Sequence, residues 1–286
     1  MGSSSVIVSQ RSQVKGQIVS RHFALCLVTF AIAVVSSPRL AGAQDIGRRL
    51  GGENGPPVAD KALASRPVVK LADGTVDLSG LWRDGGDARL PQQLKPGELD
   101  SLMLPWAKQK MASRVETDNP YFYCMPGGPL RLTGGFAWRF VQHPTVNATH
   151  IFQIQEGNSH SYRQIFMDGR KHPEDPSPTW YGHSIGTWEG PTLVVDTRGL
   201  NDKFWLDRPG TPHTEQLHLV ERWTRTNFTT LRRVVTIDDP GAFTRPFDVE
   251  FTARLAEPGN EIMEYFCVEN NQYGLPGGIT NPASKP

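Results

Sequence analysis

The sequence predicts an all-β protein whose main domain is an antiparallel up-and-down β-barrel, with an N-terminal extension and one short helix. Two observations carry this prediction. Short segments that alternate apolar and polar residues follow one another through the second half of the chain, and turn residues separate many of them. No helical pattern lies between them, so sequential strands should pair, and closure of the sheet removes its exposed edges. A β-sandwich is the alternative.

The expected strands share period-two alternation or enrichment in β-branched and aromatic residues. They cover residues 136–143, 150–155, 161–167, 184–188, 192–197, 216–225, 231–237 and 247–255. The clearest is the last strand, where Phe247, Val249 and Phe251 alternate with Asp248 and Glu250. One face of this strand should therefore be buried and the other exposed.

Residues 1–43 have the pattern of a secretory signal peptide. Basic residues precede an apolar run at 23–35, and Ala41-Gly42-Ala43 supplies small residues at the expected cleavage position. The run is short for a membrane span, so an uncleaved anchor is the less favoured alternative. We expect an exported protein, periplasmic or secreted, without stable membrane insertion after cleavage. Residues 44–76, rich in Gly, Pro and Ala at first, are expected to form a flexible leader.

The charge of the mature chain excludes one class of partner. Removing the four basic residues of the signal peptide from the 30 in the chain leaves 26, against 29 acidic residues. This balance gives no electrostatic footprint for nucleic acid or an anionic membrane surface, so no nucleic-acid partner is expected. The oligomeric state is left open.

The barrel domain is expected over residues 77–271, followed by a flexible tail at 272–286. Its first strand should begin near Gly80-Leu81-Trp82, and a Gly-x-Trp at this point resembles the start of lipocalin-like proteins, where the Trp closes one end of the barrel. A buried Trp after a turn glycine is the alternative. Apolar residues at helical spacing between 97 and 114 predict the one short helix, which Pro105 limits or starts.

Two cysteines, Cys124 and Cys267, remain in the mature chain. In an oxidising compartment two thiols favour a disulfide, and neither has a Cys-x-x-Cys partner. A bridge that closes so long a loop should contribute about 4 kcal/mol in the chain-entropy model, less any strain.

The segment 172–221 holds most of the candidate site, because titratable groups alternate there with large apolar rings, as in small-molecule pockets. The candidate catalytic residues are His183, Tyr181, Asp202, Lys203 and Asp207, and the candidate substrate-binding residues are Trp180, Trp205, Arg163, His172, His213 and His218.

His183 is the expected general base, since histidine titrates near neutral pH and Gly182 allows a sharp turn before the next strand. We expect it to face an internal cavity, in contact with Trp180 or Trp205. A turn histidine bonded to a backbone carbonyl is the alternative.

The other candidates have roles around this base. Tyr181 or Lys203 would serve as acid or oxyanion donor, and Asp202 or Asp207 would orient the base. The pair Asp207-Arg208 fits a loop salt bridge equally well, and exposed pairs contribute little.

Strand faces suggest a partly polar barrel interior. On 216–225, Leu219, Glu221 and Trp223 share one face with Arg225, so neither face is purely apolar. Arg163 would bind an anion if it points inward and would be an ordinary surface residue if it does not.

No metal and no cofactor are expected. Four histidines lie close in sequence, but no His-x-His pair occurs on a strand, which is the usual way a β-scaffold presents zinc ligands. Walker, Rossmann, His-Glu-x-x-His and Gly-x-Ser-x-Gly motifs are also missing from the sequence.

The run from Met167 to Arg225 and the segment VTIDDPGAFTRPF at 235–247 resemble a large family of exported, mostly uncharacterised proteins abundant in soil bacteria such as acidobacteria. Leu78-Ser79-Gly80-Leu81-Trp82 and Cys124-x-Pro126 also fit, so the resemblance covers most of residues 77–271. Pro191 and Leu200 depart from the family pattern and do not affect the candidate site. The resemblance implies export and says little about activity.

These patterns favour a barrel that binds an apolar or aromatic small molecule and carries out cofactor-independent acid/base chemistry on it, as a lyase or isomerase does. The alternative is a non-catalytic, lipocalin-like binding or carrier protein.

Overall fold

The computed structural model describes residues 61–85, 88–143, 149–157 and 161–268. The chain divides into two units, 1–40 and 41–286, and the first lies wholly outside the described ranges. The expected signal peptide, the first part of the leader and the C-terminal tail also lie outside them. None of the helices in the described ranges combines the length and the apolar composition that a membrane span requires.

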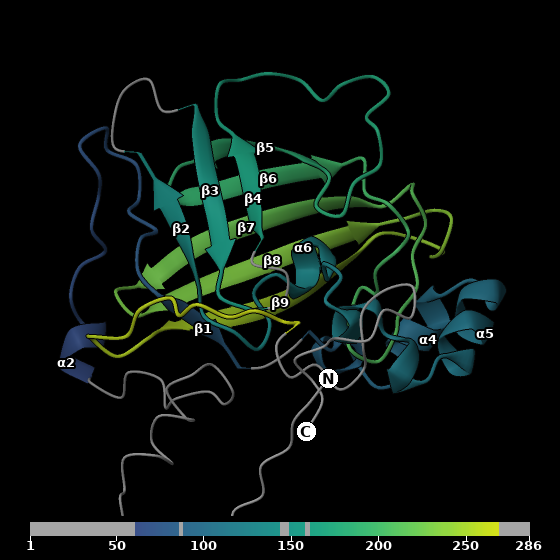
Figure 1. The fold of residues 1–286 in the computed structure, drawn as a ribbon. Helices are drawn as coiled ribbons and strands as arrows, with labels where there is room; N and C mark the ends of the chain where they lie inside the picture. Colours follow the sequence, from purple (N-terminus) through teal and green to yellow (C-terminus); the bar gives the residue numbers. More distant parts are fainter. Residues whose placement is uncertain (1–60, 86–87, 144–148, 158–160, 269–286) are drawn as a thin grey trace, which may run out of the picture. The chain divides into compact units, whose positions relative to one another are not determined.

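Within the described ranges, nine strands form a closed barrel in which each strand pairs with the next and the last returns to the first (Figure 1). They are β1 (Trp82–Asp84), β2 (Trp138–Gln142), β3 (His150–Gln155), β4 (Tyr162–Phe166), β5 (His183–Glu189), β6 (Thr192–Arg198), β7 (His218–Asn227), β8 (Thr230–Asp238) and β9 (Phe247–Leu255). The predicted all-β barrel is confirmed, and the sandwich alternative is wrong. Every expected strand is present, within about two residues at most ends.

One pair departs from the predicted antiparallel order, because β4 and β5 run parallel. A parallel pair needs a connection of a dozen or more residues that returns along the strand. The extended segment 167–182 makes this return, and Figure 1 shows it arching away from the sheet between β4 and β5. Its prolines and charged residues give no hairpin signal that would have fixed the strand direction.

The prediction of a single helix is wrong. The described helices are α2 (Lys61–Ala64), α3 (Leu90–Gln93), α4 (Glu98–Leu102), α5 (Pro105–Ser113) and α6 (Gly128–Arg131), with 3-10 turns at Glu116–Asp118 and Pro120–Tyr123. Pro105 divides the predicted 97–114 helix, because a proline disfavours helical geometry in the residue before it. That residue, Leu104, has an extended backbone with a ψ of 156°. The additional helices have four residues each, too short to show a 3.6-residue period.

Trp82 is fully buried at the start of β1, where it was expected to close the barrel. Arg225 holds this end together: its guanidinium lies 5.0 Å from the Trp82 ring centroid and donates to the carbonyl oxygens of Asp77 and Ser79. Gly80 has a φ of 129°, and a Cβ there would lie 2.5 Å from Cδ1 of Leu255. A residue with a side chain would therefore strain the approach to β1.

Among the described residues, the apolar core consists of two clusters. One surrounds Trp82, Trp138, Phe140 and Trp223 on strands of the barrel. The other joins strand residues to α4 and its neighbours, and backbone hydrogen bonds fix α4 to the segment before β9, from Leu104 to Ala242 and from Thr244 to Leu102.

The predicted disulfide is confirmed. Cys124 and Cys267 are bonded, with their Cα atoms 5.5 Å apart and a sequence separation of 143. The bond links the segment before α6 to the chain that follows β9.

Candidate functional site

A cleft of about 590 Å³ opens on the barrel wall beside β4 and under the 167–182 connection. Its lining includes Ser161, Arg163, Gln164, Phe166, Tyr181 and His183, together with connection residues between Pro173 and Thr179. Aromatic rings, hydroxyl groups, an imidazole and a guanidinium therefore converge on one concave surface, as in small-molecule sites.

The cleft lies where the barrel wall opens. β4 and β5 pair at Ile165 with Ser184 and at Phe166 with Ile185, and the ladder does not continue to Arg163 and Gly182. Gly182 has a φ of 64°, and a Cβ there would meet the Arg198 carbonyl oxygen at 2.6 Å. The glycine thus lets the chain turn into β5 close to the backbone of β6.

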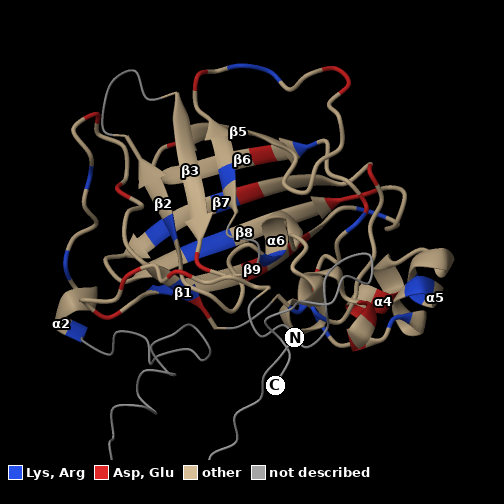
Figure 2. Ribbon diagram, viewed as in Figure 1, with Lys and Arg blue, Asp and Glu red and all other residues tan. Residues whose placement is uncertain are grey.

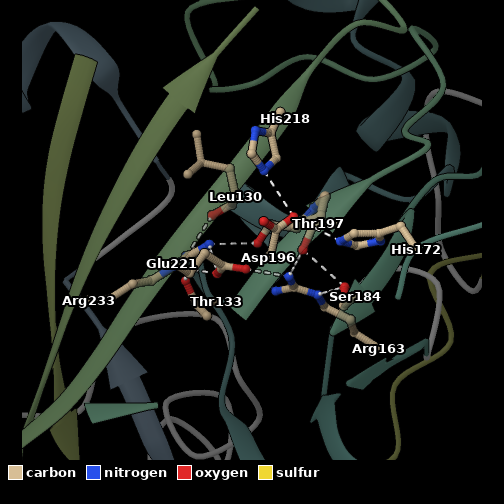
Figure 3. Close-up of polar contacts among 11 residues, drawn as sticks. Leu130, Thr133, Arg163, His172, Ser184, Asp196, Thr197, His218, Glu221 and Arg233 are labelled. Carbon is tan, nitrogen blue, oxygen red and sulfur yellow. Dashed lines mark hydrogen bonds and ion pairs between the residues drawn. The ribbon is translucent and has the colours of Figure 1, made fainter. Parts of the chain in front are cut away.

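His183 belongs to a hydrogen-bonded chain of four side chains. Its Nδ1 lies 2.9 Å from Nδ1 of His172, whose Nε2 lies 2.9 Å from Oδ1 of Asp196. His218 completes the chain, with Nε2 2.9 Å from the same Asp196 oxygen. Figure 3 shows the Asp196 carboxylate between the rings of His172 and His218.

This chain fixes the tautomers of neutral imidazoles. A carboxylate only accepts hydrogen bonds, so His172 donates to Asp196 through Nε2–H and its Nδ1 is left as an acceptor. His183 must then donate through Nδ1–H, which leaves Nε2 without a proton. Nε2 of His183 has no hydrogen-bond partner within the described ranges, so a base nitrogen remains free beside the cleft.

The ring of His183 is positioned by stacking. It lies against Phe166 with centroids 4.9 Å apart and planes 22° from parallel. The guanidinium of Arg170 lies 3.8 Å from the Phe166 centroid, and two nitrogens of Arg170 bind the Asp168 carboxylate. Burial, then the neighbouring His172 and Arg170, lower the pKa of His183 below its usual 6.5. The imidazole is therefore neutral at pH 7.

Asp196 is ionised in this arrangement. Although burial raises its pKa, the hydrogen bonds that it accepts from His218 and His172 hold that pKa below the ordinary value. Its carboxylate can thus orient both histidines and stabilise positive charge that develops on them, as the third member of a base–orienter chain does.

His183 faces the outer side of the barrel, so the prediction of an internal cavity is wrong. Neighbouring residues on a strand point to opposite faces, and Ser184 is the buried one, bonded to inward-facing Arg163. Phe166 provides the aromatic contact that was expected of Trp180 or Trp205, since Trp180 packs against the helix-side core cluster.

Arg163 points into the barrel, where it belongs to a buried cluster of charged side chains with Glu221 and Arg233. It donates to Ser184 and Thr197 hydroxyl oxygens and forms an ion pair with Glu221. Arg233 binds the other oxygen of Glu221 at 2.7 Å. Figure 3 shows Glu221 between the two arginines, and Figure 2 shows these basic and acidic segments on β4, β7 and β8.

These inner charges are almost completely excluded from solvent, with Arg163 and Arg233 each 1% exposed and Glu221 0%. Although burial raises the pKa of Glu221, Arg163 and Arg233 hold it below its usual value. Asp84 lies nearby and accepts from Trp138 Nε1, and burial raises its pKa to about 6. The partly polar interior predicted from the strand faces is therefore present, and Glu221 shares the buried face with Trp223 as expected.

The structure does not bring Asp202, Lys203 or Asp207 to His183. Asp202 and Lys203 are exposed. Asp207 is buried and accepts hydrogen bonds from the backbone nitrogens of Leu90, Gly210 and Thr211, so it shapes a loop.

Two further predicted binding residues lie elsewhere. Trp205 is buried under the guanidinium of Arg114, and it lines a separate cavity of about 340 Å³. His213 is buried with its ring nitrogens 3.0 Å from the Phe204 carbonyl and 3.2 Å from that of Thr214.

Replacing Asp207 with Asn should reduce the free energy of unfolding by about 1–3 kcal/mol, because the three backbone donors lose part of their acceptor inside the protein. Denaturant titration measures this loss. The matched variant Asp202→Asn, at an exposed position, should change it by no more than about 0.5 kcal/mol. Equal effects of the two substitutions would contradict the structural role of Asp207.

The candidate set missed Asp196 and Phe166. Asp196 carried a signal, because a carboxylate in the apolar run Leu193-Val194-Val195 of a predicted strand needs a partner. Its partners are His172 in the 167–182 connection and His218 on β7. The sequence pattern of β6 does not show that these two residues lie beside Asp196.

Within the described residues, no group of three or more His, Cys, Asp or Glu is arranged to hold a metal ion. No family model, curated protein or solved structure matched the chain.

Proposed function

We propose that this protein is a cofactor-independent enzyme that binds an apolar or aromatic small molecule in the cleft beside β4 and transfers a proton, as lyases and isomerases do. His183 is the general base. Tyr181, on the same cleft, is the acid or oxyanion donor, and Asp196 acts through His172 to orient the base.

The observation that carries the proposal is the side-chain chain from Asp196 to His183, because it leaves an unprotonated Nε2 on an imidazole at the cleft. A surface histidine without such support would sample both tautomers. The interior is occupied by the tryptophan cluster and the Arg163–Glu221–Arg233 ion pairs, so a ligand held wholly inside the barrel, as in lipocalin-like carriers, is less well supported.

A nitro-substituted benzisoxazole tests the base directly. Loss of its ring C–H proton to a base breaks the N–O bond and releases a coloured cyanophenolate, so turnover needs no further group. We expect His183→Ala to lower the rate by about 10²-fold, the lower end of the range for losing a general base, with an unchanged melting temperature. His150→Ala is the matched control, since the His150 ring also packs on Phe166, with centroids 5.0 Å apart, and does not line the cleft.

The pH dependence should follow the lowered pKa of His183. A base works only when unprotonated, so the rate should fall as pH drops through that pKa, and the midpoint of this fall should lie below pH 6.5. A wild-type rate equal to that of His183→Ala, or an equal loss in His150→Ala, would refute the proposed function.

A further inference from the structure

Two buried side chains on neighbouring strands, one of which lines the cleft, have polar atoms without partners. Gln153 on β3 and Arg163 on β4 are Cα partners in the ladder, so their side chains lie side by side on the inward face. Gln153 is 0% exposed and Arg163 1%. Within the described ranges, Nη1 of Arg163 and both Oε1 and Nε2 of Gln153 have no hydrogen-bond partner.

Such atoms are costly in a folded protein, since a buried polar group without a partner loses its hydration and gains nothing. Three of them on adjacent residues therefore indicate a position that a polar group occupies. The three atoms present two donor groups and one acceptor: N–H of Arg163, N–H of Gln153 and the Gln153 carbonyl oxygen.

The cleft gives access to this position. Arg163 itself lines the cleft, at the level where the β4–β5 ladder has ended and the wall is open. Tyr181, on the facing edge, lies with its hydroxyl 3.4 Å from Nε2 of Gln155, which shares the inward face of β3 with Gln153. A ligand whose polar end enters beside Arg163 would therefore reach the inward face of β3.

The local charge favours a neutral group. Arg163 and Arg233 are balanced by Glu221 and, at pH 7, by Asp84, whose pKa of about 6 leaves it mostly ionised. A carboxylate would add an unbalanced buried charge and would leave the Gln153 carbonyl without a donor. A carboxamide satisfies all three atoms and adds no charge.

We infer that Arg163 and Gln153 form a subsite for a carboxamide-type group, such as an amide or lactam, at one end of an aromatic ligand. The ligand carbonyl accepts from Arg163 Nη1 and Gln153 Nε2, and its N–H donates to Gln153 Oε1. This inference rests on the proposed function for the cleft as the ligand site, and it names the substrate class.

Calorimetric titration of the oxidised full-length protein with benzamide tests the subsite. Acetophenone, which has the carbonyl without the N–H, and benzoate, which has the charge, are the comparison ligands. We expect saturable binding of benzamide, at least about tenfold tighter than either, because only benzamide pairs every atom. Gln153→Met should weaken benzamide binding by at least about tenfold, and Gln216→Met, at an exposed position, should leave it unchanged.

The melting temperature of Gln153→Met shows whether weaker binding comes from loss of the subsite or from loss of the fold. Gln153→Met removes an unpaired buried amide, so its melting temperature should equal or exceed that of the wild type. Equal affinity for the three ligands, equal affinity of wild type and Gln153→Met, or a benzamide-soaked crystal with only water at the Gln153 amide would each overturn the inference.

The titration requires no turnover, so it fails or succeeds independently of the benzisoxazole assay. Benzamide binding without His183-dependent turnover would contradict the proposed reaction and leave the carboxamide subsite supported. His183-dependent turnover without benzamide binding would remove the carboxamide subsite alone.

Discussion

Glu221→Gln should reduce the free energy of unfolding by about 3–5 kcal/mol, because it leaves two buried guanidinium groups without their counter-charge. Arg163 and Arg233 both pair with Glu221, and all three side chains are at most 2% exposed. Gln keeps nearly the same shape, so the loss reports charge rather than a cavity. Equilibrium unfolding in urea measures it.

The effect should extend to α6, since Arg233 also donates to the carbonyl oxygens of Pro129 and Leu130. Amide exchange in α6 should therefore rise in Glu221→Gln. The surface pair Arg232–Glu250, with side chains about half exposed, provides the matched control, and Glu250→Gln should cost about 1 kcal/mol or less. A loss in Glu221→Gln no larger than the control would contradict a charged, buried cluster.

Removing the disulfide should lower the free energy of unfolding by about 4–5 kcal/mol, since the bond closes a loop of 143 residues and restricts the unfolded chain. To measure this loss, Cys124 and Cys267 are both replaced with Ser, and Ser is a better replacement than Gly at position 124. Cys124 has a φ of 63°, and Ser carries the same backbone strain, whereas Gly would relieve it and mask part of the loss.

Reduction of the wild-type protein is the control for the disulfide, because it breaks the bond without a substitution. Reduced wild type and the double variant should unfold at matching urea concentrations, both below oxidised wild type. A double variant that unfolds at the same urea concentration as oxidised wild type would show that the disulfide does not contribute to the stability of the protein.

Local patterns were sufficient to predict most of the barrel. Period-two alternation fixes which residues of a strand share a face, so Glu221 and Trp223 were placed together correctly, and β9 was predicted with its observed ends. The direction of β5 was not predictable in this way, because it depends on the path of the 167–182 connection rather than on any strand.

The candidate site was predicted in part. His172, Tyr181, His183 and Arg163 do gather around one cleft or its hydrogen-bonded chain, because aromatic and titratable residues cluster around β5. Which aspartate orients the histidines depended on strand pairing: Asp196 faces outward on β6 beside the crossing loop, whereas Asp207 turns inward to bond backbone amides.

Measuring the protonation state of His183 tests most directly whether this residue is the general base, since that role requires an unprotonated Nε2. Nitrogen-15 NMR of the folded protein at pH 7, with the His183 signals assigned by their loss in His183→Ala, distinguishes the two tautomers and the imidazolium. The hydrogen-bonded chain from Asp196 predicts a neutral ring with the proton on Nδ1. A proton on Nε2, or a protonated ring at pH 7, would contradict it.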